Sequence, residues 1–229
     1  MPAHAEGGTR ARVPGNPPAP PSVELLMPVP PLPPLPDQAD RLVDLGVHEL
    51  AGLTATELRE RGEASAEGLL VTPAPASALA DLLRLDGKEG FVVEDMTDVD
   101  DFAPIEEAAR PEGVYVVGGL DRGDAHRNRT PAEALPDIVA AHRSPLTLEE
   151  GLHWAIQSPA VLERNHCFMT IGSRLRKPTG GFDARTPALW ISNGTGRDGQ
   201  ARAGAPKLGW CWWGNRHTWL GIASCATRT

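Results

Sequence analysis

The sequence contains little cysteine and no apolar run long enough to cross a membrane. Spanning a bilayer takes roughly 20 consecutive apolar residues, and proline and glycine interrupt the N-terminus, which rules out the apolar stretch of a secretory signal. The three cysteines, Cys167, Cys211 and Cys225, are an odd number without disulfide-like spacing, so we expect reduced thiols. These absences predict a cytoplasmic protein that does not act on membranes.

The sequence also lacks the spacings of a zinc site, because no C-x-x-C pair occurs in it. Residues 94–101 hold five carboxylates in eight positions, just after an expected strand. Without the spacing and turn glycine of an EF-hand, this run is a weak candidate for Mg²⁺ or Ca²⁺. The alternative is a solvated loop, or one that docks on basic parts of the chain. The possible ligands are Asp95, Asp98, Asp100 and Asp101, and the sequence does not identify a cofactor.

Proline is concentrated at one end, where 12 of the 23 prolines lie within residues 1–36. Residues 28–36 are typical of polyproline II, and we expect residues 1–36 to be a disordered tail. Such a tail could also be a ligand for the aromatic groove of a protein partner. Met27 offers an alternative start. Residues 37–229 are long enough for one domain with its own core.

Charge is distributed unevenly along that domain. Residues 37–150 have 25 acidic and 10 basic residues, whereas residues 151–229 have 3 acidic and 10 basic residues. Either the two parts attract each other within one fold, or the basic part meets an anionic ligand. Because nearby acidic surface would oppose a polyanion, we expect no nucleic-acid partner.

Hydrophobic spacing predicts an α+β domain in which the strands form one mixed sheet. The acidic part reads as a small α/β unit and the basic part as mainly β. Thr54, Ser77, Thr130 and Thr147 are expected helix N-caps. The expected helices cover residues 38–45, 54–62, 77–83, 131–139 and 147–156; the expected strands cover 69–71, 91–93, 114–117, 167–171, 188–191, 207–213 and 217–223.

Gly214-Asn215 lies between two β-prone runs, and a two-residue loop that starts with glycine is typical of a β-hairpin. In that register Trp210 faces Trp219, and alternation separates the residues into two faces. Cys211 and His217 would then point apart and could not bind one metal ion. One face would carry Leu208, Trp210, Trp212, His217 and Trp219; the other would carry Lys207, Cys211, Trp213, Arg216 and Thr218.

Five of the six tryptophans lie between Trp190 and Trp219, which favours an aromatic pocket around His217. Burial there would lower the pKa of His217 and keep the imidazole neutral, as acid, base or hydrogen-bond donor. A core histidine satisfied by the backbone is the alternative. The expected ligand contacts are Asn165, Arg185, Ser192, Asn193, Arg197, Lys207, Trp210, Trp212, Asn215, Arg216 and Trp219.

Cys167 directly follows His166 and is a candidate nucleophile. Adjacent side chains on a strand point apart, so His166 is poorly placed to activate the thiol, and a buried structural thiol is the alternative. The polar run 192–199 resembles a phosphate-binding loop only superficially, because Gly204 and Pro206 follow it instead of a helix. It is either a binding loop or a plain connection between strands.

Residues 92–102, 164–174, 185–199 and 214–221 together resemble an actinobacterial family catalogued as a domain of unknown function. The resemblance extends from about residue 36 to the C-terminus. No activity is assigned to that family, so the resemblance implies no role for any residue.

These features favour binding of a small anionic or aromatic molecule at the C-terminal strands by a protein that could be an enzyme. One alternative is an interaction module that uses an exposed tryptophan face and the proline-rich tail. A second alternative is a Mg²⁺-assisted hydrolase that uses the acidic loop.

Overall fold

The computed structural model describes residues 30–63 and 67–229, so most of the predicted tail lies outside the described residues. At the described end of that tail, Leu32 packs against the core and Leu35 already belongs to the first helix. The helices are α1 (Leu35–Asp44), α2 (Val47–Leu50), α3 (Ala55–Glu63), α4 (Ala76–Asp81), α5 (Pro131–Ala140) and α6 (Leu148–Gln157). None of them has the length and apolar composition needed to cross a membrane.

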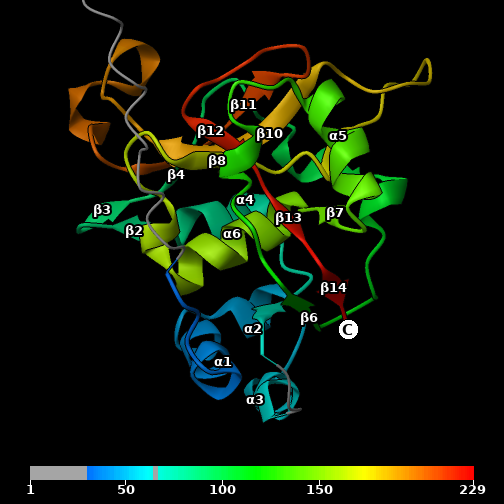
Figure 1. Ribbon diagram of the computed structural model, residues 1–229. Coiled ribbons are helices and arrows are strands. Elements are labelled where there is room, and N and C mark those ends of the chain that lie inside the picture. Colours follow the sequence, from blue (N-terminus) through cyan, green and yellow to red (C-terminus); the bar gives the residue numbers. More distant parts are fainter. Residues whose placement is uncertain (1–29, 64–66) are drawn as a thin grey trace, which may run out of the picture.

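A five-stranded mixed sheet lies at the end of the molecule opposite α1 and α3 (Figure 1). Its centre is antiparallel, with β10 between β8 and β11, and its outer strands β12 and β4 run parallel to their neighbours. The strands in spatial order are β12 (Leu220–Ile222), β8 (Cys167–Met169), β10 (Arg185–Ile191), β11 (Pro206–Trp212) and β4 (Phe91–Val92).

The remaining strands form smaller antiparallel sheets, so the described strands do not form the single sheet that was expected. One sheet has three strands, β1 (Leu69–Val71), β6 (Tyr115–Gly118) and β14 (Thr227–Arg228). Three further pairs are β2 (Arg84–Leu85) with β3 (Lys88–Glu89), β5 (Phe102–Pro104) with β9 (Ser173–Leu175), and β7 (Ser144–Pro145) with β13 (Ser224–Cys225). The mixed α+β class is confirmed.

Helix α6 lies between the three-stranded and five-stranded sheets (Figure 1). Every residue of it except Glu149 is buried, as expected for a helix packed on all sides. A capping box of Thr147 and Glu150 starts the helix, and the same arrangement of Thr130 and Glu133 starts α5. Both predicted caps are therefore confirmed.

Of the two other predicted caps, one is confirmed and one is wrong. Thr54 accepts a hydrogen bond from the Glu57 N–H at 3.2 Å, as expected of a cap. Ser77 does not cap α4, because Pro75 holds that position. Instead Ser77 donates its backbone and hydroxyl protons to Asp100, at 2.8 and 2.6 Å.

The predicted hairpin at Gly214-Asn215 is wrong. Trp210 lies opposite Pro187 of β10, and Leu220 lies beside Cys167 of β8. β11 already has β10 on one side and β4 on the other, so neither edge is left for the final strand. The chain therefore crosses to the far edge of the sheet, and the two faces deduced from the hairpin do not exist.

Ion pairs join the acidic and basic parts of the chain. Arg185 binds Asp98 at 2.6 Å, Arg197 binds Asp95 at 2.8 Å, and Arg228 binds the buried Glu150 at 2.6 Å. Arg216 pairs with Glu133. The interpretation that the two parts attract each other is confirmed by these contacts.

Candidate functional site

One face of the five-stranded sheet carries a cavity of about 390 Å³ beside α5, which packs against the same strands. Two indoles and two thiols line it, from Trp190, Trp219, Cys167 and Cys211. Its other lining residues are Arg164, Asn165, Ile191 and Asn193. We call this the aromatic cavity. It lies among the C-terminal strands, where a ligand site was expected, but it brings together Cys211 and Trp219, which the hairpin register had placed on opposite faces.

The two indoles of the aromatic cavity meet at a corner. The Trp190 and Trp219 ring centroids are 6.1 Å apart, and the planes are inclined by 68°. A flat ring stacked on one indole would meet the other edge to face, which is a favourable aromatic arrangement. This corner is suited to a planar ligand.

His217 supports this corner from outside the cavity lining. Its ring lies 5.4 Å from the Trp219 ring at an interplanar angle of 69°. Burial lowers the pKa of His217, so the imidazole is neutral near pH 7. Its Nε2 atom is buried and has no hydrogen-bond partner among the described residues. The predicted neutral state is supported, whereas direct contact between His217 and a ligand in the cavity is not.

The two thiols of the cavity are poor nucleophiles. Burial raises the pKa of Cys167 to about 11 and that of Cys211 to about 12, so both are protonated at neutral pH. The Cys167 thiol donates to the carbonyl of Glu163 at 3.3 Å. His166 instead places its Nδ1 atom 3.3 Å from the guanidinium of Arg127. The geometry therefore favours the alternative, a structural thiol, over a catalytic Cys–His pair.

Two asparagines contribute polar groups to the rim of the aromatic cavity. Asn165 has a positive φ of 67°, which asparagine tolerates better than most residues. It occupies a tight turn in which the backbones of Glu163 and His166 hydrogen-bond to each other. Asn193 is the second residue after the end of β10. Both predicted amides therefore lie at the cavity and can orient a ligand by donating and accepting hydrogen bonds.

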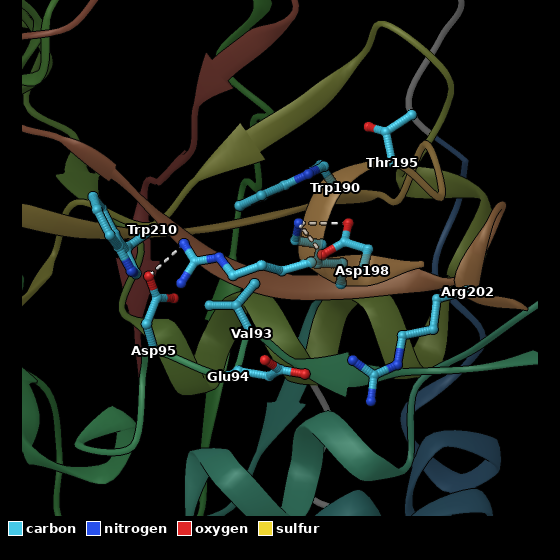
Figure 2. A pocket seen from close by; sticks show the side chains of 10 residues that line it. Val93, Glu94, Asp95, Trp190, Thr195, Asp198, Arg202 and Trp210 are labelled. Atoms are coloured by element: carbon cyan, nitrogen blue, oxygen red, sulfur yellow. Dashed lines mark hydrogen bonds and ion pairs between the residues drawn. The ribbon is translucent and has the colours of Figure 1, made fainter. Parts of the chain in front are cut away.

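Trp190 also lines a second cavity, of about 280 Å³, between the residues after β4 and the loop that joins β10 to β11 (Figure 2). Its lining includes three carboxylates, three cations, and the indoles of Trp190 and Trp210. We call it the charged pocket. The ionic residues are Glu94, Asp95, Asp198, Arg197, Arg202 and Lys207.

Asp198 organises the loop above the charged pocket. Lys207 donates to its two oxygens at 2.8 and 2.7 Å, and the Ser192 hydroxyl donates to it at 2.7 Å. Burial alone would raise the pKa of Asp198, but these hydrogen bonds hold it below its usual value. The Gly194 N–H donates to the Ser192 hydroxyl at 3.1 Å. Ser192 and Lys207 thus shape the loop, and both are engaged within the protein.

The other cations predicted to bind an anion are engaged as well. Arg185 contacts Asp98 and Asp183, at 2.6 and 3.1 Å, and Arg197 pairs with Asp95. Arg216 pairs with Glu133 and donates to the carbonyl of Asn128 at 2.8 Å. These partners count against the anion-binding roles expected of Arg185 and Arg216.

The remaining predicted contacts lie away from the aromatic cavity. Trp210 and Trp212 pack edge to face with centroids 4.5 Å apart, and 46% of the surface of Trp212 is exposed. Asn215 is an exposed turn residue whose N–H donates to the carbonyl of Trp212 at 3.0 Å. Neither Trp212 nor Asn215 lines the aromatic cavity or the charged pocket.

The acidic run at residues 94–101 is used within the protein rather than gathered around one point. Asp95 and Asp98 bind arginines, and Asp100 binds Ser77. In the part of the chain that the structure describes, no group of three or more His, Cys, Asp or Glu side chains could hold a metal ion. The alternative that this run docks on the basic part is supported for Asp95 and Asp98, whereas Asp100 binds Ser77 within the acidic part and Asp101 is exposed.

Several lining residues were missed by sequence reasoning. Trp190 and Cys211 were noted but not chosen as ligand contacts, and Arg164, Ile191 and Arg202 were not considered. The register of β10 against β11 places Trp190 opposite Lys207, and Gly209 makes room for its ring. The one local signal was Gly209, because a glycine within a strand of bulky residues often marks a site where another group approaches the backbone closely.

An α+β protein with an aromatic corner beside buried thiols is the class that this fold and site define. The chain belongs to a family of unknown function, DUF5701, which it matches over residues 41–229. No curated protein and no solved structure matched it.

Proposed function

We propose that this protein binds a small molecule with a planar aromatic body and a polar edge in the aromatic cavity. The observation that carries the proposal is the corner made by Trp190 and Trp219, two indoles inclined by 68° at a cavity of about 390 Å³. That volume lies within the range of about 300–1,000 Å³ typical of small-molecule sites.

The rim supplies the polar contacts that would orient such a ligand. Asn165 and Asn193 provide amides, and Arg164 is an exposed cation without an ion pair among the described residues. An anionic substituent on the ligand would therefore be directed toward Arg164, not toward Arg185 or Arg216. Protonated Cys167 and Cys211 would offer soft, weakly polar contacts to the ring. The geometry supports a binding function. The three free thiols favour a reducing compartment, so we place the protein in the cytoplasm.

The alternatives are less well supported. A flat protein-docking face needs adjacent exposed indoles, but among the six tryptophans only Trp212 is exposed, while Trp190 and Trp219 lie at a cavity. A Mg²⁺-assisted hydrolase needs free carboxylates, but Asp95 and Asp98 are paired with arginines.

Ligand-observed NMR with indole, benzoate and nicotinamide as probes tests the proposal. We expect at least one of these planar molecules to bind the wild-type protein and to lose at least tenfold in affinity in Trp219→Ala. Trp212→Ala removes an indole outside the cavity and is the matched control. Circular dichroism shows whether each variant is folded. Failure of all three probes to bind, or equal binding by the two variants, would contradict the proposal.

A further inference from the structure

The charged pocket has a balance of charges that the proposed function does not use. Two of its three cations are paired with two of its three carboxylates: Arg197 with Asp95 at 2.8 Å, and Lys207 with Asp198 at 2.7 Å. Arg202 and Glu94 form no ion pair with any described residue. One positive and one negative group therefore remain available at the same cavity.

The Arg202 side chain packs over an aromatic ring. Its guanidinium carbon lies 4.3 Å from the centroid of the Phe91 ring, and its backbone N–H donates to the carbonyl of Gly199 at 3.1 Å. Stacking on an aromatic ring occupies a face of the guanidinium and leaves its N–H edges for a carboxylate. Arg202 can thus receive the carboxylate of a ligand in a bidentate manner.

Glu94 comes from a different segment, the residues that follow β4, whereas Arg202 lies in the loop that precedes β11 (Figure 2). Its exposed carboxylate can accept hydrogen bonds from an ammonium group. Val93, Trp190 and Trp210 line the same pocket and provide apolar surface for the body of a ligand. The indole faces also attract a cation, including a quaternary ammonium.

We propose that the charged pocket binds a small zwitterion of the amino-acid or betaine class, with its carboxylate at Arg202 and its ammonium at Glu94. The volume of about 280 Å³ lies at the lower end of the range for ligand sites and favours a small molecule. A ligand with only one charge would engage only one of Glu94 and Arg202. This site is separate from the one proposed for aromatic ligands, although both include Trp190.

Isothermal titration calorimetry on the full chain tests this inference. The probes are the twenty common α-amino acids and glycine betaine, each at up to about 10 mM, so that dissociation constants in the millimolar range, about −4 kcal/mol of binding free energy, are measured. We expect at least one probe to bind. For that probe, the analogue without its carboxylate and the analogue without its ammonium should each bind at least about tenfold more weakly. Comparing primary amines with betaine shows which ammonium type is preferred.

Two variants assign the site. Arg202→Gln and Glu94→Gln should each weaken zwitterion binding by at least about tenfold, because each removes a charge-assisted contact. Arg176→Gln is matched to the first, since Arg176 stacks on Phe182 at 4.7 Å outside both cavities. Glu106→Gln is matched to the second, because Glu106 is exposed and has no ion pair among the described residues.

Failure of this inference is distinguishable from failure of the proposed function. Trp219→Ala should leave zwitterion binding unchanged, and Arg202→Gln should leave binding of the aromatic probes unchanged. Absence of binding by all twenty-one zwitterions would overturn the inference. So would equal binding of a singly charged analogue, or wild-type affinity in both Arg202→Gln and Glu94→Gln.

Discussion

Gly209 and Trp190 are in such close contact that no larger residue fits beneath the indole. A Cβ atom added at Gly209 would lie 2.5 Å from the Trp190 ring and 3.0 Å from the side chain of Val93. Real Cβ contacts are longer, so the ring would have to move. Because Trp190 lines both the aromatic cavity and the charged pocket, this one contact affects two candidate sites.

Gly209→Ala is therefore expected to weaken binding at both cavities together. Overpacking of this kind costs about 1–3 kcal/mol of folding stability. Titration of one aromatic and one zwitterionic probe measures the two affinities, and urea unfolding measures the stability. Gly214→Ala is the control, since nothing lies within 4 Å of its added Cβ atom. Unchanged stability and unchanged affinities in Gly209→Ala would show that Trp190 is not held as described.

Arg228→Gln is expected to destabilise the protein by about 3–5 kcal/mol, because it leaves the buried carboxylate of Glu150 uncompensated. The Arg228 and Glu150 side chains are 7% and 0% exposed, and their closest atoms are 2.6 Å apart. Arg59→Gln is the control, since the pair of Arg59 with Asp40 is exposed and contributes less than about 1 kcal/mol. Urea unfolding at pH 7 measures both. Equal effects would mean that the C-terminal strand is not anchored by this pair.

His153 should make the protein less stable in mild acid. Its Nδ1 atom lies 2.8 Å from the carbonyl of Glu149, and its Nε2 atom accepts the Thr72 N–H at 3.2 Å, which requires the neutral imidazole. Burial lowers the pKa of His153 from 6.5 to about 4. The unfolded chain therefore binds a proton that the folded chain does not, and stability falls, on the order of 3 kcal/mol, as the pH decreases through that interval.

Unfolding free energies between pH 7 and pH 4 measure this effect. His153→Gln should reduce the slope of stability against pH, whereas His142→Gln, which changes an exposed histidine, should leave it as in the wild type. A slope that is the same in all three proteins would exclude His153 as its source.

The thiols should react slowly while the protein is folded. Burial raises the pKa values of Cys167 and Cys225 to about 11 and that of Cys211 to about 12, from 9.0. Since the thiolate is the reactive form, the folded protein should react with Ellman's reagent at pH 7.5 about 100-fold more slowly than the protein in urea. Fast reaction of Cys167 in the folded state would instead revive its role as a nucleophile.

Local signals predicted five of the six described α-helices, but not the short α2, and they misplaced the cap of α4. Thr130 and Thr147 are each followed three residues later by glutamate, and both form the capping boxes that this spacing predicts. Such a motif involves only neighbouring residues, so the rest of the fold changes it little. The aromatic cavity lies among the C-terminal strands in which the concentration of tryptophan led us to expect a site.

Local signals did not predict which strands pair with each other. The dipeptide Gly214-Asn215 favours a tight hairpin, yet β11 pairs with β10 over seven residues, from Pro206 to Trp212, and its other edge is taken by β4. A long register gains more backbone hydrogen bonds than a short hairpin would, and the local preference is overridden. No nearby pattern reveals that competition.

By itself, the sequence determined the mixed fold class, the capped helices and the stretch that carries the aromatic cavity. Only the tertiary structure decided that Trp219 meets Trp190 while Trp212 remains exposed, and that Glu94 lies at the same pocket as Arg202. The physical reason is that a cavity is made by side chains from strands far apart in the chain. Which strands become neighbours depends on hydrogen bonding and packing across the whole sheet.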